Sequence, residues 1–225
     1  IFGSVRPRPT AIHASRLDPN VYRSKVTRPR FDPVPHVAVI GAGISGLFAA
    51  RTLQDHGLNV TVFEKSRGVG GRMSTRRIES GDTFDHGAQY FTARDKRFFR
   101  YVTSWEQQGI VAKWPNRGLG SEQKIVVFEN GLIKSESNSE DRFVAVPSMN
   151  SICKHLAAGL QVRTQTQIAN VTRMGDEIEL FDESQACLGK FHRLIVSAPA
   201  AQAAQLLADL PEVAGQISKI QMNPC

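Results

Sequence analysis

Three closely spaced glycines and a later glutamate form the clearest chemical pattern in the chain. Gly41, Gly43 and Gly46 make a GxGxxG motif, a spacing suited to holding the diphosphate of a dinucleotide. Gly41 permits a tight turn, Gly43 lets the backbone approach the diphosphate, and Gly46 allows a helix to pack closely on a strand. The helix beginning with Ile44 and Ser45 would offer unpaired N–H groups and a positive dipole end to the phosphates.

The acidic partner of this motif is Glu64, which ends the next apolar run, 18 positions after Gly46. An acidic residue about 20 positions after the glycines accepts hydrogen bonds from ribose hydroxyls. Its charge would repel a 2′-phosphate, which disfavours NADP at this site. The alternative interpretation is a glycine-rich turn in an unrelated α/β fold.

A second basic and glycine-rich stretch follows and favours FAD over NAD as the cofactor. It contains Lys65, Gly71 and Arg72. Gly71 allows close backbone approach, and the Arg72 guanidinium offers a charged fork to a diphosphate. The alternative is a flexible loop that happens to carry an arginine.

The elements that must position these residues follow from the hydrophobic pattern. Residues 36–40 and 59–64 are short, apolar and β-branched and predict buried parallel strands, with a helix at 44–56 between them. We expect a loop at 66–81 and an extended segment at 84–91.

Further along the chain, we expect two more helices. One spans 95–108 with a core-facing stripe of Phe98, Tyr101, Val102 and Trp105, and the other is capped by Ser148. Cys153 lies on the apolar face of the second helix and is interpreted as a core residue.

Residues 160–197 alternate like an antiparallel meander with a turn at 175–176 and a buried strand at 194–196. Pro199 then opens an alanine-rich helix. The predicted fold class is therefore α/β.

Composition excludes several function classes. The net charge of +7 is concentrated in residues 1–35, which hold seven Lys or Arg against two Asp, so nucleic acid is not expected as a partner. No apolar run is long enough for a membrane span. The three cysteines lack metal-ligand spacing, so no metal site is expected. Nothing in the sequence indicates an oligomeric state.

Residues 1–35 are rich in Arg and poor in acidic residues, which resembles a transit peptide. We expect either an organellar protein, in a plastid or mitochondrion, or a flexible tail on a cytoplasmic protein.

The chain resembles the renalase-like branch of the flavin amine oxidase superfamily. Five stretches carry the likeness: VAVIGAGISGLFAA (37–50), VFEKSRGVGGRMSTRR (62–77), FDHGAQYFTARD (84–95), FVAVPSMNSICKHLA (143–157) and RLIVSAPAAQAAQLL (193–207). The resemblance implies that Gly87, Ala88, Gln89 and Tyr90 lie near the flavin ring, with Gly87 leaving room for it, and that the strand around Ile168 contacts adenine. The alternative for residues 87–90 is an ordinary core strand with one buried tyrosine.

The resemblance also implies an organisation and an activity. We expect a three-layer FAD-binding Rossmann-type domain interleaved with an incomplete, mostly-β substrate domain, in a fragment that lacks its C-terminal part. The expected boundaries are a βαβ unit with flavin loop at 36–92, a partial substrate domain at 93–147 and a return to the FAD-binding domain at 148–225.

The expected enzyme is a flavoprotein oxidoreductase that moves a hydride from a small-molecule substrate to FAD, with oxygen as the acceptor. Renalase-like proteins oxidise isomers of reduced nicotinamide dinucleotides, which makes such an isomer the expected substrate. The alternatives are an amine oxidase-like enzyme acting on another substrate, a non-catalytic FAD-binding fragment and an NAD-dependent dehydrogenase. No side chain is assigned as catalytic.

Overall fold

The structure is a computed structural model that describes residues 34–114, 125–136 and 140–222. Residues 1–33 of the predicted tail, and Cys225, lie outside the described residues.

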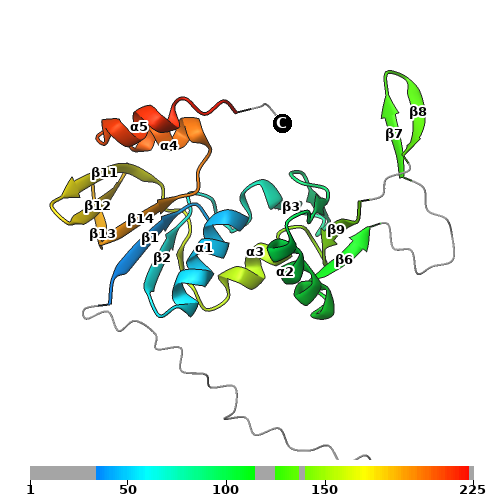
Figure 1. Cartoon of the computed structure of the whole chain (residues 1–225), viewed down its shortest axis with the longest axis horizontal. Helices are drawn as coiled ribbons and strands as arrows, with labels where there is room; N and C mark the ends of the chain where they lie inside the picture. Colours follow the sequence, from blue (N-terminus) through cyan, green and yellow to red (C-terminus); the bar gives the residue numbers. More distant parts are fainter. Residues whose placement is uncertain (1–33, 115–124, 137–139, 223–225) are drawn as a thin grey trace, which may run out of the picture. The chain divides into compact units, whose positions relative to one another are not determined.

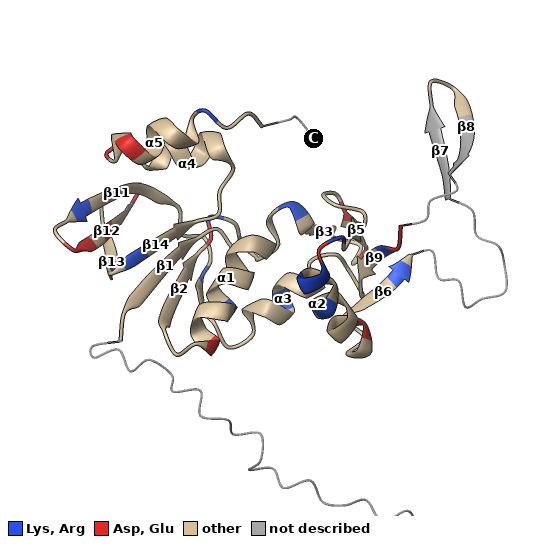
Figure 2. Cartoon of the chain, viewed as in Figure 1, with Lys and Arg blue, Asp and Glu red and all other residues tan. Residues whose placement is uncertain are grey.

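A parallel sheet of four strands forms the centre of the fold, in the order β10-β2-β1-β14 (Figure 1). The strands are β1 (His36–Ile40), β2 (Asn59–Phe63), β10 (Gln161–Arg163) and β14 (Arg193–Val196). Helix α1 (Ile44–Asp55) connects β1 to β2, which confirms the predicted βαβ unit. Neither β1 nor β2 contains a charged residue (Figure 2), as expected for strands covered on both faces.

Alternate residues of β1 face two different hydrophobic clusters, because side chains in a strand point to opposite faces in turn. Val37 and Val39 join a cluster with residues of α1 and α3 (Ser151–Ala157). Ala38 joins a second cluster with residues of an antiparallel meander, β11 (Ile168–Met174), β12 (Glu177–Asp182) and β13 (Cys187–Phe191), and of α4 (Ala200–Leu206). Helices, parallel sheet and meander are three layers, and the predicted Rossmann-type α/β fold is confirmed.

The remaining elements complete the described chain. They are η1 (Gly71–Met73), β3 (Thr75–Arg77), β4 (Thr83–Asp85), β5 (Phe91–Thr92), α2 (Lys96–Gln107), β6 (Val111–Trp114), β7 (Ile125–Glu129), β8 (Leu132–Glu136), β9 (Arg142–Ala145) and α5 (Pro211–Ile217). Strands β5, β9 and β6 form a separate antiparallel sheet. Buried residues of α2, β6 and β9 nevertheless share one hydrophobic cluster with α1.

Two predictions between residues 66 and 91 were wrong. The predicted loop at 66–81 contains the short helix η1 and strand β3, which pairs with β4 in a hairpin. The predicted extended segment at 84–91 is split between two sheets, because β4 pairs with β3 whereas β5 pairs with β9. Strand pairing decides these boundaries: β4 pairs with the neighbouring β3, whereas the partner of β5 is β9, far along the chain.

Helix α2 confirms the predicted helix at 95–108 and most of its buried face. The Asp95 carboxylate caps it by accepting hydrogen bonds from the N–H groups of Arg97 and Phe98. Val102 and Trp105 are buried, but Tyr101 is 47% exposed and packs edge-on against Phe48, so its placement in the core was wrong.

The predicted cap of the next helix was also wrong. Helix α3 begins at Ser151, and Ser148 lies in the preceding turn, where its carbonyl accepts a hydrogen bond from the Ser151 N–H.

The meander prediction needs one correction. Strands β11 to β13 are antiparallel, with the turn at Gly175, but β10 leaves this set and pairs in parallel with β2. Pro199 precedes α4 as predicted.

Cys153 is fully buried in α3, as predicted, and burial raises the pKa of its thiol to about 12. Cys187 is exposed. Because the thiolate is the reactive form, we expect iodoacetamide at pH 8 to alkylate Cys187 in the native protein and to spare Cys153. Peptide mass spectrometry checks this, with a urea-denatured sample as the control in which both react. Native alkylation of Cys153 at the Cys187 rate would contradict its burial.

No helix among the described residues is long and apolar enough to cross a bilayer. Nor do these residues contain a group of three or more His, Cys, Asp or Glu side chains placed to hold a metal ion.

Candidate functional site

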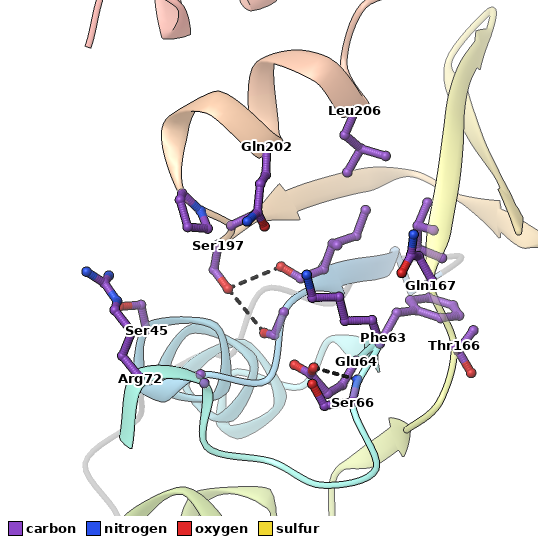
Figure 3. Close-up of a pocket in the computed structure, with 18 of the residues that line it drawn as sticks. Ser45, Phe63, Glu64, Ser66, Arg72, Thr166, Gln167, Ser197, Gln202 and Leu206 are labelled. Atoms are coloured by element: carbon purple, nitrogen blue, oxygen red, sulfur yellow. Dashed lines mark hydrogen bonds between the residues drawn. The ribbon is translucent and has the colours of Figure 1, made fainter. Parts of the chain in front are cut away.

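A cavity of about 770 Å³ opens at the carboxyl ends of the parallel strands (Figure 3). Ligands of open α/β sheets bind at this edge, and the volume lies within the range of ligand pockets, roughly 300–1,000 Å³. The sequence-predicted residues that line it are Gly41, Gly43, Ile44, Ser45, Glu64, Lys65, Gly71, Arg72 and Ile168. The fold therefore brings both glycine-rich stretches and the start of β11 to one place.

The first glycine turn is closed by contacts between main-chain atoms. Gly41 has a φ of +102°, and its N–H donates to the Phe63 carbonyl at 2.8 Å. A Cβ built on Gly46 would lie 2.0 Å from the Gly41 carbonyl oxygen. Gly46 does not line the cavity; its lack of a side chain lets α1 pack directly against the turn.

The two glycine-rich stretches also pack against each other. The Gly70 N–H donates to the Ala42 carbonyl at 2.9 Å, and a Cβ on Gly71 would lie 3.1 Å from the Gly43 Cα. A Cβ on Gly43, by contrast, would meet just the Gly71 Cα, at 3.9 Å. Bare main chain therefore faces the cavity at Gly43, where a side chain would enter space that a bound group could use.

Glu64 connects this corner to the end of β2. Its side chain is buried, and its two oxygens accept hydrogen bonds from the N–H groups of Ala42 and Ser66, each at 2.8 Å. A carboxylate has about four lone-pair sites, so two remain for a ligand in the cavity that Glu64 lines. The glutamate thus holds the glycine turn in place and still presents free acceptor sites to the cavity.

The end of the cavity away from the glycines is formed by the start of β11, which main-chain hydrogen bonds around Glu64 hold beside β2. The Glu64 N–H donates to the Arg163 carbonyl, and the Thr166 N–H donates to the Glu64 carbonyl. These bonds hold the start of β11, with Ile168, beside the end of β2. In Figure 3, Thr166 and Gln167 lie at the end of the view away from Ser45 and Arg72.

The charges on the cavity wall favour an anion near the glycines. Lys65 and Arg72 are the basic lining residues, against Glu64 as the acidic one. The N-terminus of α1 adds its positive dipole end at the same corner. A diphosphate would be complementary to this corner.

Residues 87–90 do not line this cavity, and their expected place near the flavin ring stays a prediction. The alternative, a core strand with a buried tyrosine, was wrong. Gly87 is exposed, but a Cβ on it would lie 2.1 Å from the Arg72 carbonyl oxygen, so the close approach of the Arg72 main chain requires glycine there. Ala88 donates its N–H to that same oxygen at 2.8 Å, and Gln89 is exposed. Tyr90 is 39% exposed, stacks on Trp114 and lies under the Arg142 guanidinium, so it is not a buried core tyrosine.

Sequence reasoning missed several residues of the cavity wall. They are Ile40, Phe63, Ser66, Met73, Thr166, Gln167, Ala169, Ser197, Ala198, Pro199, Gln202, Gln205 and Leu206. The Ser197 hydroxyl contacts the carbonyls of Ile40 and Gly41, each at 3.1 Å. A parallel β14 beside β1 places residues 197–206 over the glycine turn, and no local sequence pattern shows this pairing.

Comparisons with known proteins agree with this geometry. Residues 39–105 match the family of NAD(P)-binding Rossmann-like domains. An L-amino-acid oxidase from Siganus canaliculatus is 36% identical over 107 residues, 47% of this chain and 19% of that protein. The flavin-containing amine oxidase A of Sus scrofa is 47% identical over 64 residues, 28% of this chain and 12% of that enzyme.

Among solved structures, a protein described as a protoporphyrinogen oxidase, from Exiguobacterium sp. 255-15, superposes with a TM-score of 0.61 at 13% identity. The superposition covers 82% of this chain and 63% of that one, and it shows a shared fold. The chain matches less than a fifth of the length of the two curated relatives.

These matches support the predicted superfamily of flavin-containing amine oxidases and related FAD-dependent oxidoreductases, and with it the prediction of FAD as the cofactor. They do not distinguish a renalase-like branch.

Proposed function

We propose that this chain is the FAD-binding part of a flavin-dependent oxidoreductase. The main support for this proposal is the cavity at the carboxyl ends of the parallel strands, where bare glycine main chain, a helix N-terminus and a buried carboxylate meet.

The residues of the cavity fit the ADP half of FAD in type and order. Gly43 and the N-terminus of α1 would hold the diphosphate, and Arg72 would neutralise it. The free lone pairs of Glu64 would accept hydrogen bonds from the ribose. The start of β11 at Ile168 would lie against adenine.

The chemistry of the proposed enzyme would come from the cofactor. Bound FAD supplies a flavin ring that accepts a hydride from a substrate, and molecular oxygen is the proposed electron acceptor. The protein would orient the ring and exclude water. No described side chain is assigned a proton-transfer step.

The proposed substrate is a small molecule, an isomer of a reduced nicotinamide dinucleotide. The resemblance of residues 84–95 and 143–157 to renalase-like proteins supports it. The relatives named above support an amine or amino acid as the alternative.

We expect the purified protein to be yellow, with the absorption bands of a flavin and one FAD per chain. Adding a reduced nicotinamide isomer under nitrogen should bleach the bands, and air should restore them. A yellow protein that no such reductant bleaches would support FAD binding but contradict the proposed substrate and catalysis. A colourless protein that binds NAD but not FAD would overturn the proposal.

Arg72→Ala should weaken FAD binding about tenfold, which corresponds to ~1.5 kcal/mol. This is the low end for a charged hydrogen bond, because the Arg72 side chain is exposed to solvent. Fluorescence titration of the apoprotein with FAD measures the effect. Arg67→Ala, a nearby exposed arginine outside the cavity wall, is the matched control. Equal affinities of the two variants would mean that Arg72 does not touch the cofactor.

A further inference from the structure

Helix α4 presents two glutamines to the cavity from a segment that is otherwise apolar. Its sequence is AAQAAQL, and Gln202, Gln205 and Leu206 line the cavity wall. Residues three and four positions apart share one face of a helix, so these three side chains form one stripe. Ala203 and Leu207, next to this stripe, are buried in the protein.

The amides of Gln202 and Gln205 form no hydrogen bond with any other described residue. The third glutamine of the cavity wall differs, because Gln167 donates to the Glu183 carboxylate at 2.7 Å. Each free amide offers two N–H donors and a carbonyl acceptor. Two unpaired amides thus line a cavity in which Glu64, Thr166, Gln167 and Ser197 are each held by a hydrogen bond within the protein.

The position of the stripe identifies the half of the ligand that it would meet. Figure 3 shows Gln202 pointing from α4 toward Ser197, whose hydroxyl lies against the Ile40 and Gly41 carbonyls. Leu206 lies nearer the end with Thr166 and Gln167. The stripe from Gln202 to Leu206 therefore spans the stretch between the glycine turn and the start of β11.

We propose that Gln202 and Gln205 bind the adenosine diphosphate half of the cofactor through their amides, which makes α4 a wall of the binding site. This inference rests on the proposed function, since it requires a dinucleotide in the cavity. Adenine, ribose and phosphate all offer acceptors to an amide N–H, and adenine and ribose also offer donors to its carbonyl. The uncharged amides would add hydrogen bonds without adding to the charge near Arg72.

The test compares the double variant Gln202→Ala/Gln205→Ala with the natural sequence. Alanine has the highest helix propensity, so α4 should form and the melting temperature of the apoprotein should not fall. We expect the Kd for FAD to rise roughly three- to tenfold for each glutamine removed, the range of a neutral hydrogen bond. ADP alone, measured by calorimetry or by competition with FAD, should lose affinity by the same factor.

The matched control is Gln216→Ala, which makes the same change on the exposed face of α5, outside the cavity. It should leave both affinities unchanged. An unchanged Kd for FAD in the double variant would overturn the inference, and so would a loss for FAD with no loss for ADP, which would place the glutamines at the flavin half. If the natural sequence bound neither FAD nor ADP, the proposed function itself would fail.

Discussion

Replacing Gly43 by valine is expected to abolish FAD binding while the protein stays folded. Gly43 has φ −75° and ψ 175°, a conformation that any residue adopts. A Cβ there would meet no protein atom closer than 3.9 Å, so the cost of the side chain falls on the ligand. We expect the Kd for FAD to rise at least about 100-fold, equivalent to roughly 2.7 kcal/mol.

Absorbance of the purified variant and FAD titration of its apoprotein measure this effect, and circular dichroism reports the fold. Gly43→Ala should weaken binding less, because alanine adds one carbon. Gly68→Val is the control, since Gly68 lies in the neighbouring loop, outside the cavity, with no atom within 4 Å of a built Cβ. Stoichiometric flavin in Gly43→Val would place the diphosphate elsewhere.

Gly46→Ala, unlike Gly43→Val, should destabilise the fold itself, so its main effect should be seen in the apoprotein without any ligand. The new Cβ would lie 2.0 Å from the Gly41 carbonyl oxygen and 2.6 Å from the Ser197 Oγ. The first is a main-chain atom within the turn, so α1 and β1 must move apart. We expect a destabilisation of about 3 kcal/mol, the upper part of the range for overpacking, and a fall in melting temperature of roughly 6–12 °C.

The control for this variant is Gly215→Ala in α5. Gly215 lies inside a helix, and a built Cβ meets no atom within 4 Å. Alanine there should stabilise the helix by about 0.8 kcal/mol. Thermal unfolding of the two apoproteins measures both changes. Equal melting temperatures would show that the turn at Gly41 is more adaptable than its contacts indicate.

The predicted elements that were confirmed are those that local sequence controls. An apolar run followed by GxGxxG must turn at Gly41, and a second apolar run at 59–63 completes a βαβ unit whatever surrounds it. Asp95 and the spacing of Val102 and Trp105 likewise define α2. The errors at 66–91 and at β10 came from strands, because a strand's boundaries depend on which partner it finds.

By itself, the sequence determined the fold class and the glycine corner, because tight turns and close backbone contacts require glycine at fixed positions. Tertiary structure alone decided how the side chains that follow β14 complete the cavity wall. The parallel pairing of β14 with β1 brings Ser197, Gln202 and Leu206 above the glycine turn. The close approach of the Arg72 carbonyl oxygen is what excludes a side chain at Gly87. Such contacts join residues up to about 160 positions apart, and their energies depend on packing that no local pattern records.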